Sequence, residues 1–169
     1  MLKVEYVNPF LDAAFEVFET ETKVKLEKGP LSVQNSSQTS QEVSVMIGVT
    51  GELHGQVIYG MSTKTAKKIS SAMIGKQVVL LDTLAQSAIS ELGNMMTGLA
   101  TAKFSAIYNN LAITPPTLII GTNVLISTID IQRLIVVLKS ELGDIEVSIA
   151  LKEQAIAGNG QTTNFRRAG

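Results

Sequence analysis

The chain has 169 residues, of which 45% are hydrophobic and 17% charged, a balance typical of one folded domain with a substantial core. The formal net charge is −1 and no run of Lys or Arg stands out, so nucleic acid is not expected as a main partner. The absence of cysteine excludes disulfides, thiolate catalysis and cysteine-ligated metals. The N-terminus lacks the apolar core of a signal peptide and no apolar run approaches the ~20 residues that span a bilayer, so we expect a cytoplasmic protein without membrane insertion.

The N-terminal part of the chain predicts a helix followed by strands. Asn8 and Pro9 match an N-cap and a first helical residue, which predicts a helix from Pro9 to about Glu21. Residues 23–27 alternate as a short strand, and residues 34–41 are predicted to be a polar loop. Two β-rich runs on either side of residues 50–52 predict a hairpin. The core face of the first helix is predicted to comprise Phe10, Ala13, Ala14, Val17 and Phe18.

Two more helices and a second group of strands are predicted in the remaining chain. Ser62 can cap a helix that stops at Gly75, and Asp82 can cap a long helix that reaches Phe104. The prolines of residues 114–116 exclude a helix there. This order of helix, strands, two helices and strands favours an α+β fold with helices packed on a mostly antiparallel sheet. The later predicted strands are residues 117–121, 124–128, 133–140 and 145–153, the last two joined by a turn at residues 141–144.

The long helix carries polar and small residues at a spacing that places them on one face. Ser87, Glu91, Asn94 and Gly98 follow one another at intervals of four, three and four residues, so they form a single outward stripe. Gly93 and Gly98 each cost about 1 kcal/mol relative to Ala inside a helix, which predicts close approach by other structure. An exposed Glu and Asn on a helix are, on this pattern alone, more often simply solvated. The opposite face, expected to bury against the sheet, comprises Ala85, Ala88, Ile89, Leu92, Met95, Met96, Leu99 and Ala102.

Two other features are not predicted to be sites. Residues 141–144, ELGD, echo the ELGN of the long helix but lie between two strands, where no helix would project Glu and Asp together. His54, the single histidine, is expected to pack or be exposed on a strand, because no G-x-S-x-G segment accompanies it. No metal site is predicted.

The spacing Ser87-x-x-x-Glu91-x-x-Asn94 resembles the S/D-x-x-x-E-x-x-N motif of the CheC/CheX/FliY family of chemotaxis response-regulator phosphatases. Pro116 aligns with the proline that follows the motif in that family. The segments YVNPFLDAAFEVFE, GELHGQVIYGMS and ITPPTLIIG also resemble it, and the single copy of the motif favours the CheX branch. The resemblance implies a CheC-like fold, with residues 1–152 as one CheX-like phosphatase domain and residues 153–169 as a polar C-terminal tail.

The resemblance also implies a function, namely hydrolysis of the aspartyl phosphate of a phosphorylated CheY-like response regulator. Glu91 and Asn94 would be catalytic, Asn94 by positioning the attacking water and Glu91 by pairing with a lysine of the regulator. Ser87 and Gly98 would contact the partner. No cofactor is expected on this chain, whereas Mg²⁺ is expected on the regulator.

A homodimer is implied as well, and residues 124–128 and 133–140 are candidate edge strands that a second copy could cover. The alternative function is a non-catalytic docking or assembly module of the same fold in chemotaxis or two-component signalling. The intact Glu91 and Asn94 pair favours the phosphatase.

Overall fold

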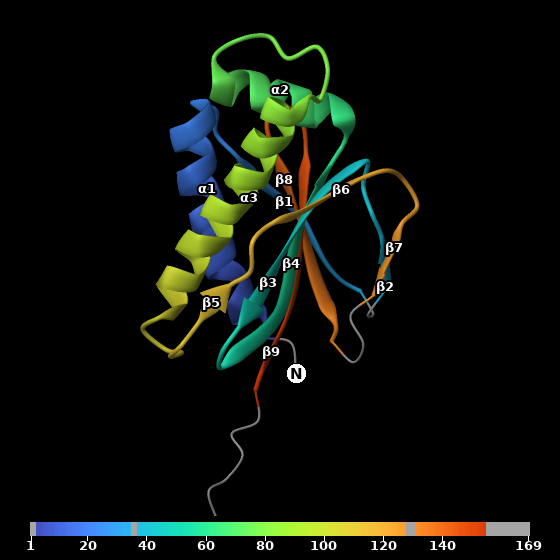
Figure 1. Cartoon of the computed structure of the whole chain (residues 1–169). Helices are drawn as coiled ribbons and strands as arrows, with labels where there is room; N and C mark the ends of the chain where they lie inside the picture. The colour runs from blue at the N-terminus through green and yellow to red at the C-terminus, as the bar shows by residue number, and fades with distance from the viewer. Residues whose placement is uncertain (1–2, 35–36, 128–130, 155–169) are drawn as a thin grey trace, which may run out of the picture.

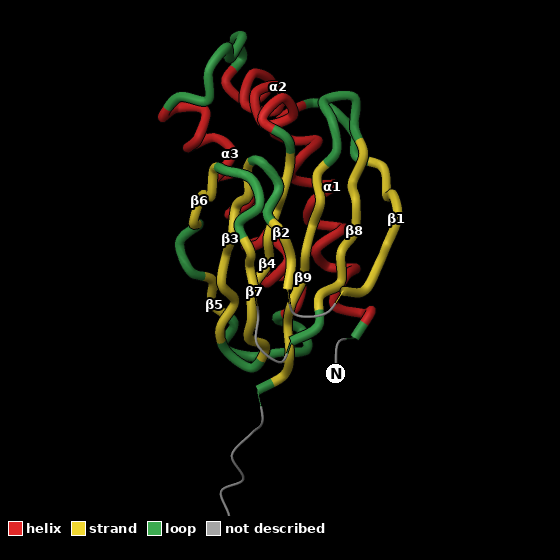
Figure 2. The backbone as a smooth tube through the Cα atoms, turned by 90° about the vertical axis from the view of Figure 1, so that its right-hand side faces the viewer, coloured by secondary structure: helices red, strands yellow, loops and turns green. Residues whose placement is uncertain are grey.

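The structure, a computed structural model, describes residues 3–34, 37–127 and 131–154. Within these residues an antiparallel seven-stranded sheet has helices α1 and α3 on one face and α2 across one end (Figure 1). The strand order is β1-β8-β9-β4-β3, and both β5 and β6 pair with the outer edge of β3. A separate two-stranded sheet, β2 with β7, lies on the side away from the helices (Figure 2). The α+β prediction is therefore confirmed.

The elements have the following bounds. The helices are a 3₁₀ turn Val4–Tyr6, α1 Val7–Thr22, α2 Thr63–Ile74 and α3 Thr83–Phe104. The strands are β1 Glu27–Gln34, β2 Ser37–Thr39, β3 Val43–Thr50, β4 Leu53–Met61, β5 Ala112–Ile113, β6 Thr117–Ile120, β7 Leu125–Ser127, β8 Arg133–Lys139 and β9 Ile145–Glu153.

Two N-terminal boundaries differ from the prediction. Helix α1 begins at Val7, so Asn8 and Pro9 lie in its first turn, where the missing amide proton of proline costs nothing because those positions have no partner within the helix. Residues 23–27 were predicted as a strand, but Lys23 adopts a left-handed conformation with φ 63° that ends α1, and the strand begins only at Glu27. The predicted core face of α1 is confirmed as buried.

Two predictions about strands were wrong. Part of the predicted polar loop, Ser37–Thr39, is β2 and pairs with β7, because backbone hydrogen bonds form a ladder whatever the side chains are. Residues 133–140 are no sheet edge, since β8 lies between β1 and β9 and buries most of its side chains. Among the described residues, the free edges are instead β1 on one side of the main sheet, β5 and β6 on the other side, and those of the small β2–β7 sheet.

Helix α3 is seated on the sheet through Gly93 and Thr97. A Cβ at Gly93 would lie 2.9 Å from Cγ1 of Val45 and 3.3 Å from Cδ2 of Tyr59, so only glycine lets the helix approach this closely. One turn later the Thr97 and Tyr59 hydroxyls are 3.0 Å apart, and the Thr97 hydroxyl is also 2.9 Å from the Gly93 carbonyl. Burial raises the pKa of Tyr59, which keeps this hydroxyl pair neutral.

The buried face of α3 is rotated slightly from the predicted one. Ala88, Met95 and Leu99 are only half-buried and Ala102 is exposed, although all four were predicted to face the core. The reason is the close seating at Gly93 and Thr97, which turns their side of the helix toward the sheet. The buried residues of α3 are Ala85, Ile89, Leu92, Gly93, Met96, Thr97, Ala100 and Phe104.

Both ends of α3 are also held in place. At the start, the Asp82 carboxylate accepts a hydrogen bond from the Ala85 amide at 2.9 Å, and Ser70 of α2 donates to the Ala85 carbonyl at 3.2 Å. At the far end, Phe104 packs against Tyr6, Phe10 and Tyr108 with ring centroids 5.8–6.2 Å apart. The outward face of α3 is therefore presented on a rigid support.

Substitution of the two α3 glycines by alanine is expected to have opposite effects. Gly93→Ala forces a Cβ against the branched, buried Val45, so we expect a net loss of about 1–2 kcal/mol in the free energy of unfolding despite the better helix propensity. Gly98→Ala meets only Cδ1 of Ile113 at 3.8 Å and should gain about 0.5–1 kcal/mol. Denaturant unfolding of both variants measures this. Equal changes in the free energy of unfolding for Gly93→Ala and Gly98→Ala would show that α3 does not pack closely against the sheet at Gly93.

Glu153, at the end of β9, ties the N-terminus to the segment after α3. Its Oε1 atom accepts hydrogen bonds from Lys3 at 2.6 Å, Tyr108 at 2.7 Å and Tyr6 at 3.2 Å. These bonds, that of Lys3 foremost, lower the pKa of Glu153 from 4.5 to about 2. Residues 155–169 of the predicted polar tail lie outside the described residues.

The lowered pKa predicts an acid-sensitive contribution of Glu153 to stability. A carboxyl group whose pKa is lower in the folded state stabilises the fold above its unfolded pKa, and this contribution disappears as the pH falls toward the folded value. We therefore expect wild type to lose its stability advantage over Glu153→Gln between pH 4.5 and about 2. Chemical unfolding across this range measures the difference. Glu19→Gln, at an exposed position of α1, is the matched control for the loss of one carboxylate.

Among the described residues, no helix is both long and apolar enough to cross a membrane.

Candidate functional site

The predicted stripe lies on the face of α3 that turns away from the sheet. Ser87 and Glu91 are exposed, and Asn94 and Gly98 are half-buried. Because Glu91 and Asn94 are three residues apart in a continuous helix, their side chains are neighbours on this face. The expectation that both are accessible to solvent is met.

The carboxylate of Glu91 and the amide of Asn94 make no polar contact with the described part of the chain. Over residues 3–34, 37–127 and 131–154, no hydrogen bond or ion pair uses either side chain. The basic residue in the last turn of α3, Lys103, instead lies 3.5 Å from the carboxylate of Glu16 on α1. The positions three and four residues away from Glu91 on α3 carry no positive charge. A negative charge and an amide are thus both free to contact another molecule.

One side of the stripe is bordered by the connection between β5 and β6. This segment contains Pro115 and the half-buried Pro116, and it follows Ile113, whose Cδ1 is the nearest atom to a Cβ built at Gly98. The connection is fixed to the sheet because the hydroxyl of Thr114 accepts a hydrogen bond from the Gly48 amide at 2.9 Å. The rigid segment confines what can approach the stripe from this direction.

The stripe continues into a shallow hollow beyond Gly98. This hollow has a volume of about 410 Å³ and lies between the last turns of α3 and the segment that follows it. The sequence did not predict it, because its far wall comes from a non-helical segment whose path depends on the Phe104–Tyr108 packing. The lining residues are Gly98, Thr101, Ala102, Ser105, Tyr108, Asn109, Asn110 and Leu111.

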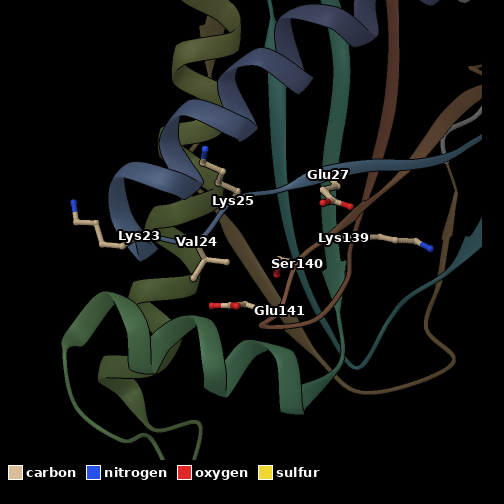
Figure 3. Close-up of a pocket in the computed structure, with 7 residues that line it drawn as sticks. All are labelled: Lys23, Val24, Lys25, Glu27, Lys139, Ser140 and Glu141. Carbon is tan, nitrogen blue, oxygen red and sulfur yellow. The ribbon is translucent and has the colours of Figure 1, made fainter.

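A second hollow, of about 490 Å³, lies near the end of α1 and the β8–β9 turn but is not built to hold an anion. Its lysines, Lys23, Lys25 and Lys139, extend in different directions and their ammonium groups do not converge (Figure 3). Glu27 and Glu141 add opposing charge to the same lining. The candidate site therefore remains the stripe on α3.

The other sequence candidates are not brought to this stripe. His54 lies on β4, paired with Lys152 of β9, and residues 141–144 form the turn between β8 and β9 as predicted. In the part of the chain that the structure describes, no group of three His, Cys, Asp or Glu residues could hold a metal ion. The chemistry that the stripe offers is one carboxylate and one amide on a rigid helix.

Comparison with known proteins identifies the family. Residues 43–139, which include the whole stripe, match the family described as chemotaxis phosphatase CheX. The chain belongs to the CheX family. It is 33% identical over 123 residues to the CheY-P phosphatase CheX of Thermotoga maritima, an alignment that covers 72% of this chain and 79% of that protein.

Solved structures agree with the assignment to the CheX family. A CheC-like superfamily protein from Shewanella sp. PV-4 has a TM-score of 0.80 and 25% identity, covering 89% of this chain and 99% of the other. The CheX–CheY–BeF₃–Mg²⁺ complex from Borrelia burgdorferi has a TM-score of 0.78 and 29% identity, with 89% and 100% covered. The predicted CheC-like fold is confirmed by these similarities.

Proposed function

We propose that this CheX-family chain is a phosphatase that hydrolyses the aspartyl phosphate of a CheY-like response regulator. The observation that carries the proposal is the free carboxylate and amide of Glu91 and Asn94, side by side on the outward face of α3. The CheY-P phosphatase named for the Thermotoga maritima relative and the CheX–CheY complex from Borrelia burgdorferi support the choice of substrate.

The proposed role of Asn94 is to hold the attacking water in line with the bond that breaks. Water attacks phosphorus, the bond from phosphorus to the aspartyl oxygen breaks, and inorganic phosphate and a free aspartate carboxylate result. An amide can accept a hydrogen bond from this water while donating another, and it does so without titrating. Phosphoryl transfer depends mainly on positioning and charge neutralisation, so a single well-placed amide suffices for this role.

The proposed role of Glu91 is to fix how the two proteins dock. Its carboxylate, which has no partner in the described ranges, can bind a lysine near the phosphorylated aspartate of the regulator, and this contact sets the position of Asn94 relative to phosphorus. Ser87 and Gly98 would contribute small contact surfaces on either side. Mg²⁺ would be bound by the acidic pocket of the regulator, so no cofactor of this chain enters the reaction.

The direct test is the decay of a CheY-like receiver that has been phosphorylated with a small phosphodonor. We expect the purified chain to accelerate release of inorganic phosphate in the presence of Mg²⁺, with turnover at substoichiometric amounts. Binding of the BeF₃⁻-activated receiver without accelerated decay would instead favour the non-catalytic docking module.

The domain and location follow from the same proposal. Residues 1–152 would form the phosphatase domain and residues 153–169 a polar tail, although Glu153 itself closes β9. Since a CheY-like receiver is a cytoplasmic protein, the chain would act in the cytoplasm.

We further expect a homodimer, which the CheX resemblance implies. The free edge of β1 exposes Leu31 and Val33, and β7 exposes Leu125, so a second copy has uncovered backbone and apolar surface to pair with. Light scattering at micromolar concentration should give twice the mass of one chain, 18.1 kDa. A monomer at that concentration would contradict the prediction.

A further inference from the structure

Three large apolar side chains are held in solvent at the start of α3. Val79 is 67% exposed, Leu80 75% and Leu84 52%, and together they are called here the N-terminal apolar patch. The connection that carries the first two lies beside the N-terminal end of α3 (Figure 1). Contiguous exposed apolar surface is typical of a contact surface, and these three residues lie within six positions of one another in the chain.

This exposure is not the result of a loose connection. The Val78 amide donates to the Ser71 hydroxyl at 2.9 Å, and the Lys67 ammonium donates to the Val79 carbonyl at 3.3 Å. On the other side, Leu81 packs against the core and its carbonyl accepts a hydrogen bond from the side-chain amide Nε2 of Gln86 at 2.8 Å. The backbone is thus anchored before and after Leu80, and the patch is preorganised for a partner.

Helix geometry places Leu84 on the same outward face as the catalytic pair. Leu84 and Glu91 are seven residues apart, so they point in nearly the same direction and are separated by about 10 Å along the axis. A standard interface covers roughly 800 Å² on each partner, which corresponds to a radius of about 16 Å. A globular protein centred on Glu91 and Asn94 would therefore cover Leu84.

We propose that the N-terminal apolar patch is the hydrophobic half of the docking surface for the response regulator. The patch contacts an apolar area on the receiver domain next to its phosphorylation site, while Glu91 makes the charged contact. This inference rests on the proposed function for the identity of the partner. In this arrangement the apolar side chains supply the affinity, because they lose contact with water on binding. The carboxylate of Glu91 fixes the relative position of the two proteins.

The test uses Leu80→Gln, Leu84→Gln and the double variant. Glutamine has a helix propensity close to that of leucine, so α3 should persist. Ile107→Gln is the matched control, because Ile107 is 73% exposed and lies past the opposite end of α3. The probe is a CheY-like receiver loaded with BeF₃⁻ and Mg²⁺, and its dissociation constant is measured by titration at about 0.1 M and 0.5 M salt.

Each single substitution is expected to raise the dissociation constant by about fivefold to tenfold, and the double variant on the order of 50-fold. The loss should be the same at both salt concentrations, because burial of apolar surface is not screened. The rate of dephosphorylation at saturating chain should stay within about twofold of wild type. Ile107→Gln should bind as wild type does.

Three results would overturn the inference. One is a double variant that binds the receiver within about twofold of wild type. Another is a loss of binding in Ile107→Gln equal to that of the double variant, and the third is a change in the oligomeric state of the free double variant, which would make the patch a contact between copies of this chain.

Failure of the proposed function gives a different result. If wild type binds the receiver through the patch without accelerating hydrolysis, the docking surface stands and the proposed phosphatase activity is wrong. If wild type binds no receiver, both proposals are wrong.

Discussion

Asn94→Ala is expected to lose most of the stimulated dephosphorylation while keeping its fold and its binding to the regulator. Loss of one positioning group of this kind typically costs ~2–4 kcal/mol of transition-state stabilisation, or roughly 10²–10³ in rate. Asn94 is half-buried on a helix and its side chain has no hydrogen-bond partner among the described residues, so alanine should be tolerated and should even favour the helix slightly. Single-turnover release of phosphate measures the rate.

An Asn→Ala substitution outside the stripe tests whether the position of the amide matters, and not only the loss of an amide group. Asn8→Ala removes the same group from an exposed position in the first turn of α1, which lines neither the stripe nor the hollow beyond Gly98, and it should leave the rate near that of wild type. Asn94→Gln is a finer probe, because it keeps the amide but moves it by about one methylene. A misplacement near 1 Å can cost roughly 10²-fold. If Asn94→Ala works as fast as wild type, the amide is not catalytic and the chain is a docking module.

Glu91→Ala is expected to weaken docking in a salt-dependent manner. Its carboxylate is exposed and has no ion-pair partner among the described residues, so the energy of an ion pair to the regulator is gained on binding. We expect the dissociation constant to rise roughly tenfold at low ionic strength, with a smaller fall in rate. The difference from wild type should shrink as salt is raised, because the screening length falls from ~10 Å at 0.1 M to ~3 Å at 1 M.

Two variants test whether charge is the cause. Glu91→Gln keeps the length and shape of the side chain but replaces one carboxylate oxygen, an acceptor, by an NH₂ group, a donor. It should therefore reproduce most of the effect of Glu91→Ala if charge dominates. Asp12→Asn removes one negative charge from an exposed position of α1 and controls for net charge. A loss that is unchanged between low and high salt would assign Glu91 to shape rather than to charge. The N-terminal apolar patch should show that salt-independent behaviour, so the two contacts can be distinguished in one titration.

The sequence by itself determined the order of elements and the face on which the site lies. Local signals were sufficient for this, because Ser62 and Asp82 do cap α2 and α3, Gly75 does end α2, and helical spacing alone places Glu91 beside Asn94. The hairpin at Gly51 and the break at Pro115 followed from the same short-range chemistry. The family resemblance then supplied the chemistry, which a Glu and an Asn on a helix do not specify by themselves.

The tertiary structure decided which surfaces are covered and how closely. Residues 133–140 are internal because β1 pairs on one side and β9 on the other, and no local pattern contains that pairing. The rotation of α3 that half-buries Leu99 depends on contacts of Gly93 and Thr97 with Val45 and Tyr59, which are far away in the chain. The exposure of Leu80 likewise depends on the tertiary arrangement, because no other described segment packs over this side chain. Periodicity is a property of neighbours along the chain, whereas burial is a sum over neighbours in space, so the first could be predicted and the second had to be observed.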